Sequence, residues 1–299
     1  MLKLDKIWFN GKLISWDKAQ VHILTHALHY GSGVFEGIRC YDTGRGGAVF
    51  RLADHVKRLF YSAECLGIKI PFSPNVLKKA VLATIKTNHL NECYIRPIVF
   101  CGLGTVGLDI SHSPIYAAII VWPWETYLSG KDISAFVSKF KRLSPKALPI
   151  DAKINGYYVN SIMAAAEAKK KRADEAILLD DNGFVAEGPG ENIFTVKNGK
   201  LYTPAKGFIL PGITRDSIMK IAEGLNIKVV EKRISQEELN NSDEMFFTGT
   251  AVEVCPITRL NGRKIGDGKP GKITQSVKNK YDKIVRGGDN SYKKWLTYV

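Results

Sequence analysis

Residues 151–192 limit the possible fold and function of this chain more than any other segment. Lys153 lies among small and apolar neighbours, ahead of a stretch with helical spacing at 157–171. An apolar, strand-like run at 183–186 then leads into Glu187-Gly188-Pro189-Gly190-Glu191-Asn192. Glycines after a strand allow a flat molecule to approach the backbone closely. The segment therefore predicts a mixed α+β fold in which a lysine and a glutamate converge on one bound molecule.

Hydrophobic spacing and turn signals predict the other elements. The Asn-Gly pairs at 10–11, 198–199 and 261–262 indicate hairpins, and Ser235-Gln236-Glu237-Glu238 is a capping box for a short helix. Strands are expected at 34–41, 47–51, 93–101, 115–122, 133–140, 175–180 and 243–247, and helices at 53–66, 74–89, after Gly212 and at 273–285. The stretch 123–130 has no clear period, so we predict domains at 1–121 and 132–299, connected by an interdomain loop at 122–131.

Composition excludes several classes of protein. The chain has 299 residues, enough for two domains, and a formal net charge of +14 spread along its whole length without a nucleic-acid-binding signature. Five cysteines without CxxC spacing predict reduced thiols and neither a disulfide frame nor a metal site. Charges interrupt the N-terminus, and no apolar run approaches the roughly 20 residues needed to span a bilayer. We expect a cytoplasmic protein that binds neither nucleic acid nor membrane.

Lys153, Tyr158 and Glu187 together suit pyridoxal 5'-phosphate. A single lysine is usually only a surface charge, but a partly buried one is a competent imine nucleophile. Tyr158 would face the phenolate oxygen of the cofactor, although the adjacent Tyr157 is an alternative. Glu187 would keep the ring nitrogen protonated, so that the ring can absorb carbanion electrons.

Two turns are candidates for the phosphate, because helix N-termini and exposed amides bind anions. One is Leu210-Pro211-Gly212-Ile213-Thr214, which leads into a predicted helix, and the other is Phe247-Thr248-Gly249-Thr250-Ala251, which follows a predicted strand. Arg58 could supply a positive charge, but its spacing alone favours an ordinary polar residue on a helix face.

The chain resembles the class IV, or fold type IV, pyridoxal-phosphate enzymes, and within them the branched-chain-amino-acid aminotransferases, over nearly its whole length. The motifs that carry the resemblance are His29-Tyr30-Gly31-Ser32-Gly33-Val34-Phe35-Glu36-Gly37-Ile38-Arg39, His55-x-x-Arg58-Leu59, Tyr94-Ile95-Arg96-Pro97, and residues 153–158, 187–194, 211–215 and 249–251. It implies a small α/β domain, a larger domain with a barrel-like mixed sheet and helices, and a cofactor in the interdomain cleft.

The resemblance also implies roles for individual residues. Lys153 would form the internal aldimine with pyridoxal 5'-phosphate and move protons during a reversible ping-pong reaction through pyridoxamine phosphate. That reaction would transfer the amino group of leucine, isoleucine or valine to 2-oxoglutarate. The cofactor would be held by Arg58, Lys153, Tyr158, Glu187, Gly190, Leu210, Gly212, Ile213, Thr214, Gly249 and Thr250. Substrate would contact Tyr30, Phe35, Gly37, Tyr94, Arg96, Val106, Trp124, Thr250 and Ala251.

One pocket must then accept both leucine-like side chains and the distal carboxylate of glutamate. We expect Arg96 to meet that carboxylate from a partly solvated position, because a buried arginine without a partner would penalise apolar substrates. Val106 lies in a glycine-rich loop, 102–108, which either closes the site of a neighbouring subunit, as in the family, or is an ordinary surface loop. The six histidines are expected to be structural or surface groups.

The resemblance implies small amino-acid and 2-oxo-acid substrates and a homo-oligomer, at least a dimer and possibly a hexamer, with Tyr30 entering the partner's site. Alternatives within the fold are a D-amino-acid transaminase, an R-amine transaminase and an aminodeoxychorismate lyase. An alternative from another class, a basic non-catalytic RNA-binding protein, predicts a damaged cofactor set, whereas every expected position is filled.

Overall fold

A computed structural model describes residues 4–124 and 132–299. The chain forms two compact units that are discontinuous in sequence. The first comprises the described residues of Met1–Glu125, Ala152–Tyr157 and Lys283–Val299, and the second those of Thr126–Asp151 and Tyr158–Asp282. The contiguous division at 1–121 and 132–299 stays a prediction, and residues 125–131 of its connecting loop lie outside the described residues.

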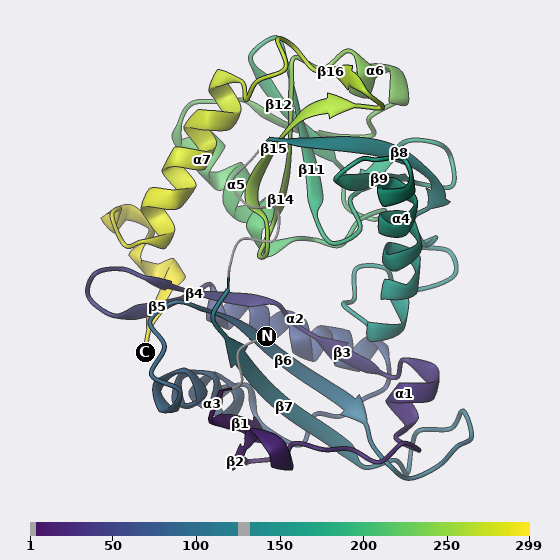
Figure 1. Cartoon of the computed structure of the whole chain (residues 1–299), viewed down its shortest axis with the longest axis vertical. Helices are drawn as coiled ribbons and strands as arrows, with labels where there is room; N and C mark the ends of the chain where they lie inside the picture. The colour runs from purple at the N-terminus through teal and green to yellow at the C-terminus, as the bar shows by residue number, and fades with distance from the viewer. Residues whose placement is uncertain (1–3, 125–131) are drawn as a thin grey trace. The chain divides into compact units, whose positions relative to one another are not determined.

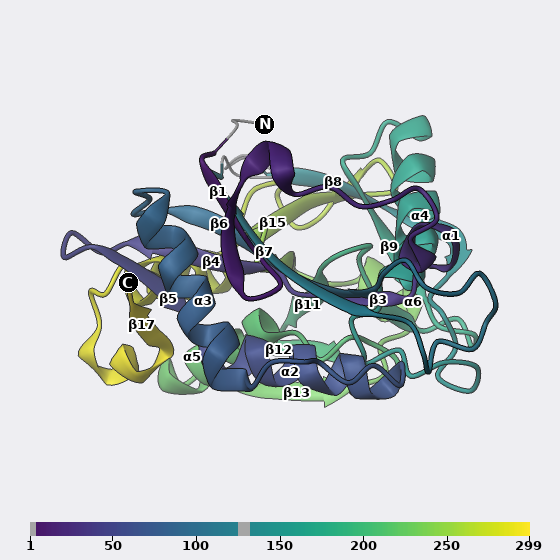
Figure 2. The same cartoon turned by 90° about the horizontal axis from the view of Figure 1, so that it is seen from below.

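The first unit is built on an eight-stranded sheet (Figures 1 and 2). Its order is β17-β5-β4-β6-β7-β1-β2, with β3 also paired to β6. The strands are β1 Lys6–Phe9, β2 Lys12–Ser15, β3 Gly33–Phe35, β4 Ile38–Asp42, β5 Gly47–Phe50, β6 Cys93–Cys101, β7 Ile115–Trp122 and β17 Leu296–Tyr298. Helices α2 (Leu52–Cys65) and α3 (Pro74–Thr87) pack on each other and against this sheet. Their apolar faces and the strands share one core, which includes Leu59, Val81 and Ile95.

The expected strand at 34–41 is wrong in one respect, because it is interrupted at Glu36 and Gly37. β3 and β4 both pair with β6, and the register is unchanged from Phe35↔Ile98 to Ile38↔Ile95. The residue opposite Glu36 is Pro97, which has no N–H to donate to the ladder. At this position the pair can therefore form one backbone bond, from the Glu36 amide to the Pro97 carbonyl at 2.9 Å, and not the reverse one.

The second unit contains a mixed nine-stranded sheet (Figure 1). Its order is β10-β9-β8-β15-β14-β11-β12-β13, with β16 paired to β15. The strands are β8 Ile133–Lys141, β9 Glu175–Leu179, β10 Val185–Glu187, β11 Asn192–Lys197, β12 Lys200–Pro204, β13 Val229–Lys232, β14 Glu244–Gly249, β15 Glu253–Leu260 and β16 Arg263–Lys264. The two ends of the sheet approach each other, since the Val185 amide donates to the Ile234 carbonyl at 2.9 Å. The sheet therefore curls in the barrel-like way predicted.

The helices of the second unit follow the predicted signals. α4 (Tyr158–Lys170) packs on β8 and β9, and α5 (Ile213–Gly224) packs on β13 and β14. α6 (Gln236–Asn240) begins with the predicted capping box at Ser235. α7 (Lys272–Val285) begins in the second unit, and its residues from Lys283 onward belong to the first. It ends before Gly287, whose φ of 74° stops the helix. Short elements without a clear pattern were not predicted: α1 (His26–Tyr30), β17 and the 3₁₀ turns Trp16–Lys18, Asn155–Tyr157 and Asn290–Trp295.

Among the described residues, no helix is long and apolar enough to cross a membrane. Within the same ranges, 4–124 and 132–299, no group of three or more His, Cys, Asp or Glu side chains could hold a metal ion.

One buried carboxyl group in the second unit is expected to make stability depend on pH. Glu175 begins β9 and is 3% exposed. Burial raises its pKa to about 6, against an ordinary 4.5; a hydrogen bond from the Ala176 amide opposes this rise, and the charge of Asp174 adds to it. Between these two pH values the folded state retains a proton that the unfolded state has released. Stability therefore falls as pH rises through this window.

Glu175→Gln, which cannot ionise, should raise the free energy of unfolding by roughly 2 kcal/mol at pH 7.5 and change it little at pH 4. Urea unfolding of both proteins at the two pH values measures the difference. An equal effect at both would contradict ionisation as the cause.

Candidate functional site

The segment that carries Lys153 is fixed to the first unit through its backbone. The Lys153 amide donates to Ser62 Oγ of α2 at 2.8 Å, and the Lys153 carbonyl accepts from the Phe35 amide of β3 at 3.2 Å. One residue further on, Ile154 forms a β-bridge with Val34. The lysine side chain is half-buried, with Nζ 4.9 Å from the ring centroid of Phe35. The backbone that carries the amine is therefore held by β3 and α2.

Two glycines, Gly31 and Gly156, allow the segment after Lys153 to lie against the end of α1. Gly31 has φ of +64°, and a Cβ on it would lie 2.6 Å from the Cα of Gly156. The Gly156 amide donates to the Gly31 carbonyl at 3.2 Å. Any side chain at Gly31 would push away the segment that follows Lys153.

Arg58 projects from α2 onto a carboxylate. Its Nε and Nη2 donate to the two oxygens of Glu36 at 2.6 and 2.9 Å, and His55 Nδ1 lies 2.7 Å from Glu36 Oε2. Burial by itself would raise the pKa of Glu36, but the charges of Arg58 and His55 and their hydrogen bonds hold that pKa well below its ordinary value. Burial also lowers the pKa of His55, with Glu36 opposing this shift and Arg58 and Lys153 adding to it. Glu36 is therefore ionised, and His55 is a neutral donor.

Aromatic rings surround Arg96 in the same unit. Its guanidinium carbon lies 4.7 Å from the centroid of Phe35, 5.4 Å from Tyr94 and 5.9 Å from Trp122. Arg96 Nη2 donates to the Tyr94 hydroxyl at 3.3 Å, whereas Nε is buried and has no partner among the described residues. Trp124 stacks on Tyr94, with centroids 4.5 Å apart. A Cβ on Gly37 would lie 2.0 Å from the Tyr94 hydroxyl, so only glycine fits beside this ring.

The loop at 102–108 is attached to α1. The Tyr30 hydroxyl donates to the Val106 carbonyl at 3.0 Å, and His26 Nε2 lies 2.9 Å from the Gly107 carbonyl. The side chains of Tyr30 and Val106 are 51% and 64% exposed. Both are therefore accessible on the described surface of this chain.

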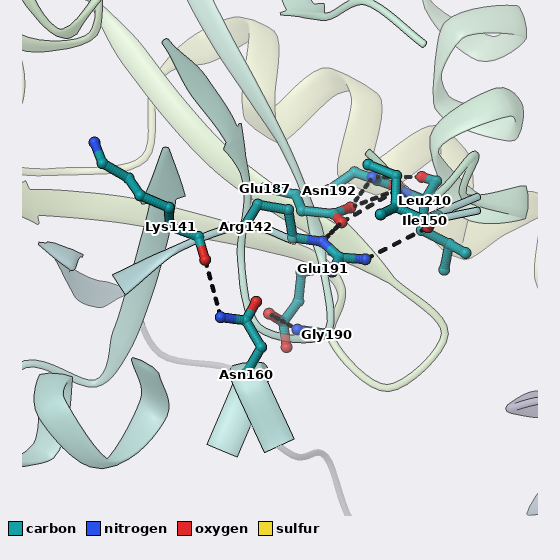
Figure 3. A network of polar contacts seen from close by, with 9 residues as sticks. All are labelled: Lys141, Arg142, Ile150, Asn160, Glu187, Gly190, Glu191, Asn192 and Leu210. Atoms are coloured by element: carbon teal, nitrogen blue, oxygen red, sulfur yellow. Dashed lines mark hydrogen bonds and ion pairs between the residues drawn. The ribbon is translucent and has the colours of Figure 1, made fainter. Parts of the chain in front are cut away.

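In the second unit, Glu187 is the centre of a polar network (Figure 3). Arg142 Nε donates to Glu187 Oε1 at 2.5 Å and Asn192 Nδ2 to Oε2 at 3.0 Å, while the Leu210 amide reaches both oxygens at 3.2 and 3.1 Å. Glu187 is 4% exposed. Arg142 was not anticipated from the sequence, where it follows a strand with no motif around it. Its charge compensates the buried carboxylate.

The loop after Glu187 is held by its own polar side chains. Glu191 Oε2 accepts from the Gly190 amide at 3.0 Å, and Asn192 Nδ2 also donates to the Leu210 carbonyl at 2.9 Å (Figure 3). Leu210 is thus bonded to Asn192 through its carbonyl and to Glu187 through its amide. These bonds connect the loop to the turn that leads into α5.

The start of α5 has the features of an anion site. Gly212 is its N-cap and has no side chain that could cap the first turn, which begins with Ile213 and Thr214. Arg215 anchors the helix, because its Nη2 donates to the Pro204 carbonyl at 2.8 Å and to Glu231 at 2.7 Å. The turn at Gly249 lies against Gly190, whose carbonyl would be 3.4 Å from a Cβ on Gly249. Thr250 and Ala251 follow in this turn and are half-buried.

The predicted residues divide between the two units. Arg58, Lys153, Tyr30, Phe35, Gly37, Tyr94, Arg96, Val106 and Trp124 belong to the first, and Tyr158, Glu187, Gly190, Leu210, Gly212, Ile213, Thr214, Gly249, Thr250 and Ala251 to the second. Tyr157 packs against the core of the first unit, whereas Tyr158 begins α4 in the second. The residues present fit pyridoxal 5'-phosphate: an amine, a buried carboxylate and a helix N-terminus whose N-cap is a glycine.

A family model described as "Amino-transferase class IV" matches residues 33–260. This chain belongs to the class IV aminotransferase family. A branched-chain-amino-acid aminotransferase from Pseudomonas aeruginosa is 44% identical over 297 residues, 98% of this chain and 97% of that protein. The predicted resemblance is confirmed.

Solved structures of aminotransferases have the same fold. The branched-chain aminotransferase of Thermoproteus uzoniensis, crystallised with norvaline, has a TM-score of 0.95 and 41% identity and covers 99% of both chains. The branched-chain amino acid aminotransferase of Thermobaculum terrenum, in its PLP-bound holo-form, has a TM-score of 0.94 and 31% identity and covers 99% of this chain and 98% of that chain. The predicted two-domain class IV fold is confirmed.

Gly212 should tolerate no side chain, because of Asn192. Its φ of −63° suits alanine, yet a Cβ there would lie 1.9 Å from Asn192 Oδ1. Displaced Asn192 would lose its bonds to Glu187 and Leu210. Gly212→Ala should lower the free energy of unfolding by about 1–3 kcal/mol, measured in urea.

Gly190→Ala is the matched control, because a Cβ at Gly190 would meet nothing within 4 Å. It should change stability by less than about 0.5 kcal/mol. Equal effects of the two substitutions would show that the contact with Asn192 is not the cause.

Proposed function

We propose that the protein is a pyridoxal-phosphate-dependent branched-chain L-amino acid:2-oxoglutarate aminotransferase. The observation that carries this proposal is the 44% identity to a branched-chain-amino-acid aminotransferase over nearly the full length of both chains. The site chemistry supports it, since an amine, a ring-nitrogen partner and a phosphate-binding helix N-terminus all belong to the cofactor set.

When bound, pyridoxal 5'-phosphate supplies the electron sink that stabilises negative charge at the substrate α-carbon. Glu187 pairs with the ring nitrogen, and Tyr158 donates to the phenolate oxygen. Arg58, the amides of Ile213 and Thr214, the Thr214 hydroxyl and Thr250 hold the phosphate; Gly190, Leu210, Gly212 and Gly249 shape the backbone around it.

Lys153 would hold the cofactor through its amine and would supply the group that moves a proton at the substrate α-carbon. An amine held by a fixed backbone can reach that carbon without searching for it. The Thr250–Ala251 amides and Tyr94 receive the α-carboxylate of the substrate.

Phe35, Gly37, Tyr30, Val106 and Trp124 line the pocket for the aliphatic side chain, and Arg96 meets the distal carboxylate of glutamate. The rings around Arg96 support this dual use. Cation–π contacts hold the guanidinium while an apolar substrate is bound, and a carboxylate offers it a stronger partner.

The site is completed in a homo-oligomer, at least a dimer and possibly a hexamer, with Tyr30 and loop 102–108 reaching the partner's site. We place the enzyme in the cytoplasm. All five cysteines are free thiols, as is usual where disulfides are kept reduced.

Turnover of different donors tests the function against its alternatives. Purified protein should transfer the amino group of L-leucine to 2-oxoglutarate far faster than that of D-alanine or of an R-amine, and should release no pyruvate from aminodeoxychorismate. A preference for D-alanine, for the R-amine or for aminodeoxychorismate would replace the proposal with the corresponding activity.

Lys153→Ala should strongly reduce turnover, because no other amine is assigned to the proton transfer. We expect a loss of about 10²–10⁴-fold or more in kcat with L-leucine. Lys57→Ala removes an exposed lysine from α2 and should retain the activity of the parent protein. Activity of Lys153→Ala equal to that control would contradict the assignment.

Arg96→Gln should discriminate between substrates. Loss of one charge-assisted contact should lower kcat/KM for glutamate by about 10- to 100-fold and for leucine by less than about 5-fold. Stopped-flow half-reactions with each amino acid measure the two values. Equal losses would show that Arg96 only supports the fold of the pocket.

A further inference from the structure

Glu36 and His55 have no part in the reaction proposed above, although both are buried beside a residue that does. Glu36 is 0% exposed and His55 2%. Glu36 occupies the interruption between β3 and β4, and its two oxygens accept from Arg58 Nε, Arg58 Nη2 and His55 Nδ1. Both donors come from α2, one helical turn apart.

Stability alone does not explain this arrangement. Moving a carboxylate and a guanidinium out of water costs several kcal/mol each, and well-packed apolar residues often stabilise a core equally well. A bidentate carboxylate fixes the plane and the rotation of a guanidinium, which an apolar neighbour cannot do.

We propose that Glu36, supported by His55, is a positioning residue that orients the guanidinium of Arg58 for the phosphate of the cofactor. Glu36 contacts one edge of the fork, formed by Nε and Nη2. The opposite edge, which includes Nη1, is thereby held in one direction. The phosphate meets a donor that is already oriented, so little side-chain entropy is lost on binding. His55 in turn holds Glu36, since its Nδ1 bonds the oxygen that Nη2 also reaches.

This inference rests on the proposed function, in which Arg58 binds phosphate. It makes a distinct claim about affinity: Glu36 should matter for ligands with a phosphate and not for those without one. A purely structural role for Glu36 would weaken both kinds of ligand equally.

The test compares pyridoxal 5'-phosphate with pyridoxal, which lacks the phosphate. Apoprotein is prepared from the parent and from Glu36→Gln, His55→Gln and Glu64→Gln, and the Kd of each ligand is measured by fluorescence titration. Glu64 is exposed on the same helix and serves as the control. Circular dichroism and thermal melting establish that each apoprotein is folded.

Glu36→Gln should reduce the preference for pyridoxal 5'-phosphate over pyridoxal by about 10- to 100-fold, and Glu64→Gln should leave it unchanged. His55→Gln keeps the ion pair and should reduce the preference by about 5-fold, which retains the test if Glu36→Gln does not fold. An unchanged or increased preference in the folded variants would overturn the inference. If the parent protein itself showed no preference, the role of Arg58 in the proposed function would fail instead.

Discussion

Both sides of the Lys153 residue are hydrogen-bonded to the first unit, and the chemistry proposed for this chain depends on that attachment. The amide reaches Ser62 Oγ on α2 and the carbonyl receives the Phe35 amide of β3. An amine on a free loop would have to find its substrate, whereas one on a fixed backbone samples only its own side-chain rotamers. Ala152–Tyr157 belongs to the first unit by packing, although the flanking residues belong to the second.

Two buried carboxylates are stabilised in the same way, each by an arginine and by further hydrogen-bond donors. Glu36 is compensated by Arg58 and His55, and Glu187 by Arg142, Asn192 and the Leu210 amide. An ion in a protein interior is costly unless charge and hydrogen bonds surround it. Each carboxylate is therefore held in one orientation. In the proposed function, Glu187 would pair with the protonated ring nitrogen of the cofactor, and Glu36 would orient Arg58 for its phosphate.

Much of the secondary structure could be predicted from local patterns. The Asn-Gly hairpins, the capping box at Ser235 and the β-rich runs of β6 and β7 all formed where their residues indicated. The break between β3 and β4 could not be predicted in the same way. It depends on Pro97, which lies opposite Glu36 only once the two strands have paired.

Only those site residues that belong to sequence motifs could be predicted from the sequence. Lys153, Glu187 and the turn before α5 are parts of motifs, so their roles could be proposed from the sequence. The partners Arg142 and Ser62 could not be assigned, and the contact of the motif residue Glu36 with Arg58 could not be predicted, because these contacts join residues far apart in the chain. Arg142 is 45 residues from Glu187 along the chain, and Ser62 is 91 from Lys153. Arg142 and Ser62 lie in none of the quoted motifs, so the sequence did not indicate their supporting role.

Covalent attachment at Lys153 is the central claim, and chemical trapping tests it most directly. Holoprotein is reduced with borohydride, which fixes the cofactor to the amine that holds it, then digested and analysed by mass spectrometry. The account predicts a phosphopyridoxyl group on the peptide that contains Lys153 and on no other. A label on a different lysine, or the absence of any label, would contradict it.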